Sequence, residues 1–567
     1  MLRMDVDESR RLTGPNLLSD NPGAVMEVFI EGAEISQVIV LWKKYLQQLL
    51  ASLNLQAEIY HRSFSDGANL GFSADEDMLY CACEINEAAI ELARAELSGE
   101  DADSELTSLS RLQDILKEER NPQLMRLISV ANENQVTYLV DDDEFSLGMG
   151  NHSQCWSVAQ LPEPSSVNWS KYKDIPVALI TGTNGKSTSV RMCDAIVKAS
   201  GVSAGITSTD YIRAADTIID RGDYSGPGGA RTLIRDHRVE LALLEVARGG
   251  MLRRGIGTST AKAALITNVA DDHLGQYGIN TVDELIAVKA IVARSLSADG
   301  TLVVNADDQG LVDYFQQHPE LIRGKICWFS LNSDNEKVVE QKLSKQACVW
   351  IEDECILISD KGETKRLISV ADIPTTMKGA AKHNVSNSMG AAALCYALNI
   401  DFDDITTGLK NFKGDNNDNP GRGNYFDING VTVLVDFAHN SHSLTAVIDT
   451  VAAIPAKRRL IMLGHAGDRS DRDINNLTEV ATQLNPDAVV TAELADYLRG
   501  RELGAVPAII KQRCLDNGIS SDNIFYAKSS LEGAKLALEW AQPGDFVLLL
   551  ALDQRDAIFQ YFETLSR

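Results

Sequence analysis

One stretch of this 567-residue chain, residues 176–188, constrains its fold more than any other. The apolar residues 177–180 predict a buried parallel strand, which breaks at Gly182 into a short glycine-rich loop. The loop leads into an amphipathic helix, which we predict over residues 187–200. Backbone N–H groups that converge in such a loop, together with the helix N-terminus, form a binding site for phosphate.

The charged and hydroxyl side chains of this loop favour the same ligand. Lys186 supplies a full positive charge beside the glycines, and the hydroxyl of Ser187 or Thr188 is a potential Mg²⁺ ligand. The spacing G-x-x-G-K-S-T is shorter than the general G-x-x-x-x-G-K-[ST] pattern. A tight turn with an incidental lysine is the alternative. Because strand, glycines, lysine, hydroxyls and helix all agree, we interpret the stretch as a phosphate-binding loop.

Two further apolar runs place polar side chains at strand ends. Residues 241–244 predict a strand that ends at Glu245. Residues 263–268 predict another strand, which leads to Asp272 and His273. In a parallel sheet these strand ends lie at the edge that carries the phosphate-binding loop. Glu245 is therefore a candidate anchor for nucleotide-bound Mg²⁺, and His273 is a candidate ligand of a second metal ion or of the transferred phosphate. A lone histidine is, however, more often structural.

Alternating strands and helices predict an α/β protein with several domains. We expect a doubly wound central domain over residues 171–414 and a smaller Rossmann-like domain over residues 420–567. An acidic α+β domain over residues 1–165 precedes them. A Pro/Ser-rich linker at residues 161–166 and a polar hinge at residues 413–421 separate these parts. The chain length agrees with this organisation, because 567 residues suffice for three or four domains of about 150 residues each.

Two local predictions concern the central domain. Residues 282–296 predict one helix, which carries Lys289 either on its surface or in the ligand cleft. Short apolar runs between residues 325 and 367 predict an antiparallel excursion from the sheet.

Composition excludes several classes of function. The net charge of −27 argues against nucleic-acid binding by bulk electrostatics. No apolar run reaches the ~18 residues that a membrane span needs, and the N-terminal residues lack the apolar core of a signal peptide. We therefore expect a cytoplasmic protein without a membrane partner. The nine cysteines are scattered, which is typical of reduced, buried thiols rather than of a disulfide framework.

Acidic side chains are concentrated in the first third of the chain. Residues 1–170 contain 29 acidic and 11 basic side chains, which is −18 of the total −27. Solubility is one explanation, and electrostatic steering of a cationic substrate or partner is the other. Four consecutive carboxylates at residues 141–144 form the densest cluster. A metal site is one interpretation of it, but we expect a solvated turn.

Taken together, the motifs of this chain resemble those of the Mur ligase superfamily, in the family's order, over residues 174–567. The matching residues are the loop 181–188, Glu245, Thr267-Asn268 before Asp272-His273, Lys289, His383-Asn384 with Asn387, Gly421-Arg422 and Asp436-Phe-Ala-His-Asn440. A closer likeness is to the Mur-like half of cyanophycin synthetases, in residues 222–227, 245–253, 272–275, 467–469 and 498–501. Those enzymes carry an ATP-grasp module before the Mur-like half, whereas here the N-terminal domain is expected to join that half directly.

The resemblance implies roles for several of the matching residues. Lys186 would contact the β- and γ-phosphates of ATP, while Ser187 and Glu245 would hold one Mg²⁺ ion. His273 and a carbamylated Lys289 would hold a second, so that Lys186, Glu245, His273 and Lys289 form the catalytic set. Also expected at the nucleotide are Thr183, Asn184, Gly185, Thr188, Asn384, Arg422 and Asp436, and expected at the substrate are Thr209, Asn268, Arg248 and His439.

The resemblance also implies ATP-dependent amide formation between a carboxylate and an amine, with an acyl phosphate as intermediate and ADP as product. We expect amino-acid or short peptide substrates related to the building blocks of cyanophycin. Cations at the phosphate loop suit this chemistry, because ATP and a carboxylate repel each other. Two alternatives stay open, a nucleotide-binding regulatory scaffold without activity and a folate-type polyglutamate ligase. A homo-oligomer is compatible with the sequence.

Overall fold

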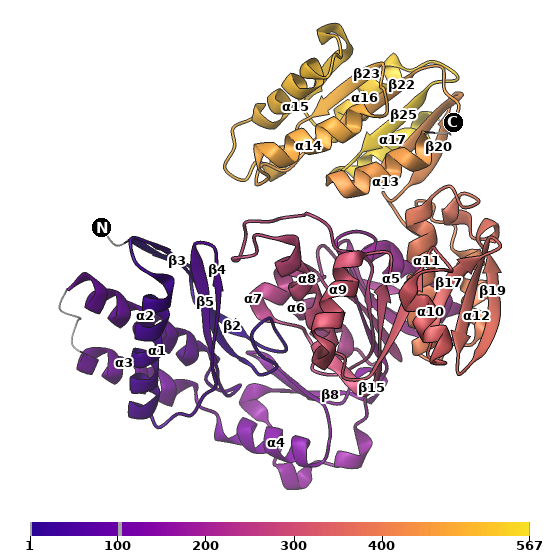
Figure 1. The fold of residues 1–567 in the computed structure, drawn as a ribbon. Coiled ribbons are helices and arrows are strands. Elements are labelled where there is room, and N and C mark those ends of the chain that lie inside the picture. The colour runs from indigo at the N-terminus through magenta and orange to yellow at the C-terminus, as the bar shows by residue number, and fades with distance from the viewer. Residues whose placement is uncertain (1–2, 100–104, 453, 566–567) are drawn as a thin grey trace. The chain divides into compact units, whose positions relative to one another are not determined.

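The structure, a computed structural model, describes residues 3–99, 105–452 and 454–565. The chain folds into two compact units, whose elements are labelled in Figure 1. The first unit comprises Met1–Ile351, Leu357–Arg366 and Met389–Gly408, and the second comprises Glu352–Ile356, Leu367–Ser388 and Leu409–Arg567. The boundaries of the three predicted domains stay predictions.

A large, mostly parallel sheet organises the first unit. Among the described residues it has eleven strands, in the order β12-β11-β10-β13-β9-β14-β15-β16-β17-β18-β19. From β10 to β17 neighbouring strands pair in parallel, whereas β11 and β12 add an antiparallel edge. The strands are β9 Val177–Thr181, β10 Ala204–Thr207, β11 Tyr211–Ala214, β12 Thr217–Arg221, β13 Leu241–Glu245, β14 Ala261–Ile266, β15 Leu296–Asn305, β16 Lys325–Ser330, β17 Cys348–Glu352, β18 Cys355–Asp360 and β19 Glu363–Ser369.

The order of the strands reverses at β9. The chain proceeds from β9 to β10 and β13 on one side, and then to β14, β15, β16 and β17 on the other. Such a reversal leaves a crevice at the carboxyl ends of the two central strands, where α/β sheets bind their ligands. The predicted phosphate-binding loop follows β9 directly, so the fold places it at this crevice.

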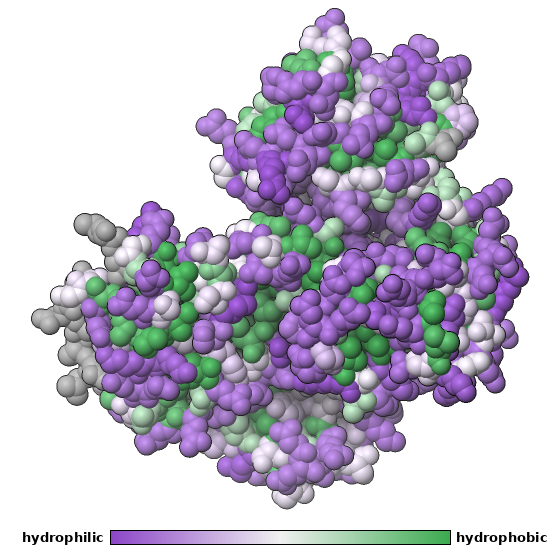
Figure 2. Space-filling model, in the orientation of Figure 1, coloured by the Kyte–Doolittle hydropathy of each residue, from purple (hydrophilic) through white to green (hydrophobic). Residues whose placement is uncertain are grey.

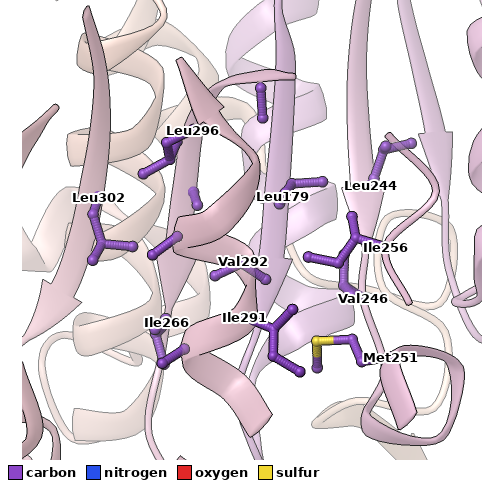
Figure 3. Close-up of a cluster of buried hydrophobic side chains, with 14 of the residues drawn as sticks. Leu179, Leu244, Val246, Met251, Ile256, Ile266, Ile291, Val292, Leu296 and Leu302 are labelled. Carbon is purple, nitrogen blue, oxygen red and sulfur yellow. The ribbon is translucent and has the colours of Figure 1, made fainter. Parts of the chain in front are cut away.

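Helices cover both faces of this sheet. On one face, α6 Pro227–Ile234, α7 Arg248–Arg254, α8 Val282–Ala290 and α9 Gln309–Gln317 bury apolar side chains against alternate strand residues such as Leu179, Leu244 and Ile266 (Figure 3). On the other face lies α5 Lys186–Ala199, whose Cys193 thiol contacts the Ala391 carbonyl of α11, Lys382–Ala397, at 3.9 Å. The side chains on each strand therefore alternate between two apolar cores, which explains the unbroken apolar runs.

The structure corrects two local predictions. The helix predicted over residues 282–296 ends at Ala290 and continues as the 3₁₀ turn η5, Ile291–Ser295, while Leu296 already belongs to β15. The antiparallel excursion over residues 325–367 is wrong for its first part, because β16 and β17 are parallel and a helix, α10 Glu336–Leu343, connects them. The buried face of α10 is narrow, with Val338 and Gln341 as its buried residues, so its sequence reads as polar.

A small antiparallel sheet opens the chain. Its order is β1-β3-β5-β4, with β2 paired to β3. Helices α1 and α2 pack on it through apolar residues at helical spacing, such as Trp42 and Ile85, and Trp42 also donates from its indole N–H to Asn86 at 2.9 Å. The elements are β1 Arg3–Val6, β2 Arg10–Leu12, β3 Gly23–Glu31, α1 Ile35–Ser52, β4 Ile59–Phe64, β5 Gly67–Ser73, α2 Leu79–Ser98 and α3 Glu105–Glu119.

A helix and a three-stranded sheet then lead to the large sheet. They are α4 Pro122–Glu133, β6 Tyr138–Val140, β7 Glu144–Leu147 and β8 Gln154–Ser157. The turn between β6 and β7 carries the acidic cluster. The expected solvated turn is wrong for Asp141, which is half-buried and pairs with Arg231 and Arg235. Asp142 pairs with Arg11 but is exposed, as are Asp143 and Glu144.

The second unit contains a Rossmann-like sheet in the order β20-β21-β25-β22-β23-β24. β20 is antiparallel to β21, and the other neighbours are parallel. One apolar core lies under α13, α14 and α15, and another lies under α16 and α17. The elements of this part are β20 Asn424–Ile428, β21 Val431–Asp436, α13 Ser441–Val451, β22 Arg459–Leu463, α14 Asp471–Thr482, β23 Ala488–Ala492, α15 Ala505–Asp516, β24 Ile524–Ala527, α16 Ser530–Trp540, β25 Phe546–Leu550 and α17 Arg555–Leu565. Before them, helix α12, Phe402–Asn411, begins in the first unit and ends in the second.

On the face of the molecule drawn in Figure 2, hydrophilic residues cover most of the surface. In Figure 2 apolar residues are scattered in small groups between polar ones. Among the helices that the structure describes, none combines the length and apolar character that crossing a bilayer requires.

Candidate active site

The phosphate-binding loop connects β9 to α5. Gly185 precedes α5 with φ +85°, a left-handed conformation that suits glycine, and the helix then starts at Lys186. The Lys186 ammonium donates to the carbonyls of Gly182 and Thr183 at 3.1 and 2.9 Å. The lysine charge therefore lies over the loop, beside the positive end of the helix dipole. Both features favour an anion at this place.

Close packing against the neighbouring strand holds the loop. Gly182 has φ +145°, and a Cβ atom built on it would lie 1.9 Å from the Thr267 hydroxyl oxygen. Thr267 follows β14 and donates to the Asn184 carbonyl at 2.6 Å. The Asn268 side chain binds both backbone groups of Asn184, because it donates to the Asn184 carbonyl at 3.0 Å and accepts from the Asn184 N–H at 3.1 Å. The loop is thus fixed by the end of β14.

Three oxygen-bearing side chains meet at the first turn of α5. The Ser187 hydroxyl donates to a Glu245 carboxylate oxygen at 3.2 Å and lies 3.3 Å from the Thr209 hydroxyl. Glu245 is the last residue of β13 and is 2% exposed. Hard cations such as Mg²⁺ prefer such oxygen ligands. Ser187 and Glu245, which the sequence predicts as metal ligands, are therefore within hydrogen-bonding distance of each other.

Lys289 is buried among charged groups. It lies near the end of α8 and is 4% exposed. Burial lowers the pKa of Lys289 well below its ordinary value; the positive charges of Lys186 and Arg248 lower it further, and Asp272 and Glu245 oppose them. The lowered pKa favours the neutral form of the lysine amine, which is the nucleophilic form.

Arg248 organises the segment that carries His273. Its guanidinium donates to the His273 carbonyl and, at 2.6 Å, to the Gln276 side chain. His273 has φ +55°, which is uncommon outside glycine. Arg248 was predicted at the substrate, and in the structure its guanidinium contacts this backbone. Among the described residues, no group of three or more His, Cys, Asp or Glu side chains forms a metal-binding cluster.

Four predicted site residues belong to the second unit. The Asn384 side chain donates to the Thr375 carbonyl at 3.0 Å. Arg422 lies over the ring of Phe437 at 4.1 Å. Burial raises the pKa of Asp436 to about 6, although Arg422 and backbone N–H groups, including that of Ala438, oppose the shift. A His439 ring nitrogen is 3.0 Å from the Phe437 carbonyl.

Two residues that shape the site, Thr267 and Asp272, were given no role from the sequence. Thr267 was not among the predicted site residues, although its hydroxyl packs on Gly182 and holds Asn184. The negative charge of Asp272 raises the pKa of Lys289 and so opposes the effect of burial. Both could have been found from their place at the end of the strand beside β9, where a doubly wound sheet gathers its functional residues.

Two segments of the chain that contain these residues match models of known protein families. The model of the Mur ligase middle domain matches residues 180–395. The model of the Mur ligase glutamate ligase domain matches residues 421–551. The first segment contains the phosphate-binding loop, Glu245, His273 and Lys289, and the second contains Arg422 and Asp436.

Two kinds of curated relatives resemble the chain. The cyanophycin synthetase of Geminocystis herdmanii (strain PCC 6308) is 35% identical over 349 residues, which are 62% of this chain and 39% of that protein. The chain thus spans well under half the length of this relative. The UDP-N-acetylmuramoyl-L-alanyl-D-glutamate--2,6-diaminopimelate ligase of Geobacter metallireducens is 27% identical over 405 residues, which are 67% of this chain and 74% of that protein.

Solved structures show a weaker likeness. FolC of E. coli in complex with DHPP and ADP has 16% identity and a TM-score of 0.49, and covers 69% of this chain and 89% of its own. MurF from Acinetobacter baumannii has 18% identity and a TM-score of 0.47, with 69% and 76% covered. Two consecutive family segments and the relatives lead to one conclusion: residues 180–551 of this chain belong to the Mur ligase family, as its middle domain followed by its glutamate ligase domain.

Proposed function

We propose that this protein is an ATP-dependent ligase that joins a carboxylate to an amine and forms ADP. The named activities of its relatives, cyanophycin synthetase and a diaminopimelate ligase, support an amide-forming reaction. The chain covers only part of the former, so its own activity and substrates are proposals. We propose amino acids or short peptides as the substrate class, because the sequence resembles that of cyanophycin synthetases and predicts substrates related to the building blocks of cyanophycin.

One observation carries the proposal. Lys289, buried and with a strongly lowered pKa, shares its surroundings with Lys186, Glu245 and Asp272. A structural lysine at this position would be costly, because burying an amine beside a second cation disfavours its charged form. A neutral amine that adds to CO₂ forms an N–C bond, releases one proton and becomes a carbamate anion. The carbamate oxygens can hold a divalent cation, which is the charge that a triphosphate needs beside it.

The donor set suits Mg²⁺. Ser187 and Glu245 would hold one ion, and His273 with carbamylated Lys289 would hold a second. When bound, such ions neutralise charge on the phosphates and on the attacking carboxylate. The hydroxyl of Thr209, 3.3 Å from Ser187, keeps the serine oxygen oriented toward this place.

The chain's own groups then supply positioning and charge. The loop N–H groups and Lys186 orient the β- and γ-phosphates of ATP, so that the acid substrate attacks in line and an acyl phosphate forms. Arg248 holds the backbone of His273, and thereby fixes where this ring lies. In the second unit, Asn384, Arg422 and Asp436 are the proposed contacts to the nucleotide, and His439 is a proposed substrate contact. Water must be kept out, because it hydrolyses an acyl phosphate.

A matrix of carboxylates and amines tests the proposal. Purified protein with ATP and Mg²⁺ is offered amino acids and short peptides in pairs, while phosphate release is measured and nucleotide products are separated. ADP is expected with one pairing, and hydroxylamine should trap the acyl phosphate as a hydroxamate. K186M should lower turnover about 100-fold or more. K198M is the matched control, since Lys198 lies on the same helix with its side chain 48% exposed.

The outcomes separate the alternatives. Nucleotide binding without turnover in any pairing would favour a regulatory scaffold. Turnover that requires glutamate and a folate acceptor would favour a folate-type polyglutamate ligase. Formation of AMP in place of ADP, or normal turnover by K186M, would contradict the proposed chemistry.

A further inference from the structure

A second cavity lies in the first unit, away from the phosphate-binding loop. Its volume is about 710 Å³, within the range of sites for small organic ligands. Its wall comes from the N-terminal sheet and α2, from α4 and β6, and from α6 and α7. None of the loop residues 182–188 lines it. It touches the far end of α7, whose first residue is Arg248 and whose last is Arg254.

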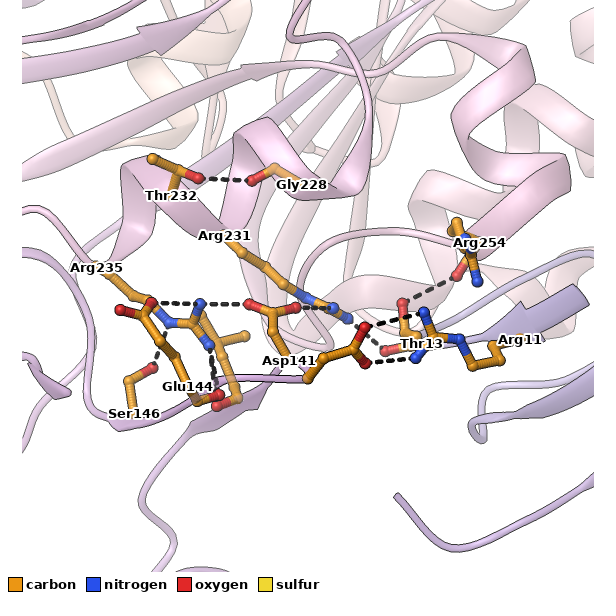
Figure 4. A network of polar contacts seen from close by, with 12 residues as sticks. Arg11, Thr13, Asp141, Glu144, Ser146, Gly228, Arg231, Thr232, Arg235 and Arg254 are labelled. Atoms are coloured by element: carbon orange, nitrogen blue, oxygen red, sulfur yellow. Dashed lines mark hydrogen bonds and ion pairs between the residues drawn. The ribbon is translucent and has the colours of Figure 1, made fainter. Parts of the chain in front are cut away.

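Most charges in this wall are already paired. Asp141 lies between the guanidinium groups of Arg231 and Arg235, with Arg231 at 2.6 Å (Figure 4). Asp142 accepts from Arg11 and, at 2.8 Å, from the Tyr80 hydroxyl. The other paired carboxylates are Asp20 with Arg294 and Arg323, Asp77 with Arg120, and Glu119 with the N–H groups of Tyr80 and Cys81. They are therefore structural.

Arg254 is the surplus cation of the cavity. Its backbone carbonyl accepts the N–H and the hydroxyl of Thr13 at 2.9 and 3.3 Å, so the main chain at this position is held. Within the described residues its guanidinium forms no ion pair or hydrogen bond, although the Asp142 carboxylate, which is paired with Arg11, also attracts it. Burial and the neighbouring charge of Arg11 lower the pKa of Arg254, but a guanidinium stays protonated in proteins. A half-buried, crowded cation of this kind attracts an anionic group.

Glu76 is the surplus carboxylate. It accepts from the Tyr138 hydroxyl at 2.7 Å, and none of the described cationic side chains forms an ion pair with it. Burial raises the pKa of Glu76, while the tyrosine hydroxyl opposes the shift. A cation beside this carboxylate would relieve the cost of burying its charge.

We propose that this cavity binds a short peptide with a free carboxylate and a cationic group, the carboxylate at Arg254 and the cation at Glu76. The volume and the acidic surroundings favour this class over an inorganic anion. Residues 1–170 carry a net charge of −18, which raises the local concentration of positively charged ligands. An acidic surface alone would attract any cation, whereas this cavity also contains Arg254, which can bind the carboxylate of the peptide. Polar neutral groups, including Tyr80, Asn121 and Thr258, also line the cavity.

Binding is measured on the full chain without nucleotide, by calorimetry. This inference does not depend on the ligase proposal, because no turnover is needed. The probes are the dipeptide alanyl-arginine, its C-terminal amide, which lacks the carboxylate, and N-acetyl-alanyl-citrulline, which lacks both cationic groups. The unmodified protein should bind the dipeptide at least about tenfold more tightly than either analogue, because each analogue loses one charge-assisted contact.

Two variants assign the contacts. R254M should weaken dipeptide binding about tenfold and leave the amide unchanged. E76Q should weaken the dipeptide and the amide alike, and leave the citrulline analogue unchanged. Both variants keep the local structure, since Thr13 uses only the Arg254 main chain and glutamine still accepts from Tyr138. The matched controls are R253M, next to Arg254 in the chain, and E118Q on α3; both residues are exposed and neither lines the cavity.

The proposal fails if alanyl-arginine does not bind at concentrations up to about 10 mM. It also fails if R254M and R253M weaken binding equally, because the effect would then come from the lost positive charge and not from a contact at Arg254. Competition by ATP with the dipeptide would place the peptide at the phosphate-binding loop and would equally overturn a separate site.

Discussion

At the scale of single residues, the environment of a titratable group sets its chemistry. Lys289 and Asp436 illustrate this in opposite ways. Burial lowers the pKa of the first and raises that of the second, because a low-dielectric interior disfavours the charged form of either. Both residues are therefore held toward their neutral forms, and each gives a prediction that needs no knowledge of the substrate.

Carbamylation of Lys289 can be observed directly. The unmodified protein in ¹³C-bicarbonate at neutral pH should give a carbamate resonance in its ¹³C spectrum, because the lowered pKa of Lys289 favours the neutral amine that reacts with CO₂. The signal should be absent from K289M and retained in K410M, which changes an exposed lysine. An unmodified protein without the signal, or a K289M variant with it, would contradict the proposed carbamate.

Asp436 should make stability depend on pH in a defined direction. Its folded pKa of about 6 is above the value of about 3.9 for an unfolded chain, so the folded state binds an extra proton between these values. This contribution is complete below about pH 4 and is lost as pH rises through about 6, with a size of about 3 kcal/mol at most.

D436N isolates that contribution, because asparagine does not titrate. Thermal unfolding of both proteins is followed from about pH 4.5 to about pH 7.5. The midpoint of D436N minus that of the unmodified protein should increase with pH. A difference that is constant or decreases over this range would show that Asp436 is not titrating as described.

At the scale of elements, the phosphate-binding loop depends on the strand beside it. Gly182 makes the sharp departure from β9, and the Thr267 hydroxyl occupies the space that a side chain at residue 182 would need. The loop therefore owes its shape to a contact between β9 and β14 as much as to its own glycines.

G182A should destabilise the protein by about 1–3 kcal/mol, because φ +145° strains alanine and its Cβ collides with Thr267. Adding T267A removes the collision but not the strain. The double variant should therefore be less destabilised than the sum of the two single variants, as measured by denaturant unfolding. Strict additivity would mean that the two residues do not meet as described.

At the scale of the whole molecule, the net charge is the main electrostatic influence on stability. A charge of −27 produces self-repulsion, which destabilises compact states at low ionic strength. Local ion pairs work in the opposite direction, but exposed pairs contribute little.

Raising NaCl from about 10 mM to about 500 mM should therefore raise the unfolding midpoint, since screening reduces long-range repulsion. An uncharged osmolyte at equal osmolality is the control for solvent exclusion. A midpoint that falls with salt would mean that ion pairs such as Arg231–Asp141 outweigh the repulsion.

The sequence by itself determined the elements whose signals are local. The strand, glycine loop and helix around Lys186 follow from an apolar run, from glycines that accept unusual dihedral angles and from a helix start, all within thirteen residues. The alternation of such units predicts the doubly wound sheet, and strand ends predict where Glu245 and His273 lie along it. Short-range sterics and burial patterns decide these features.

Only the tertiary structure decided features that depend on neighbours distant in the chain. Helix α10 has a narrow buried face, so its pattern could not reveal the parallel pairing of β16 with β17. The sequence also left open whether Lys289 is exposed, and it gave no sign that Arg254 and Glu76 line one cavity. Burial and electrostatic fields arise from atoms brought together across many residues, and a residue's own sequence context does not contain them.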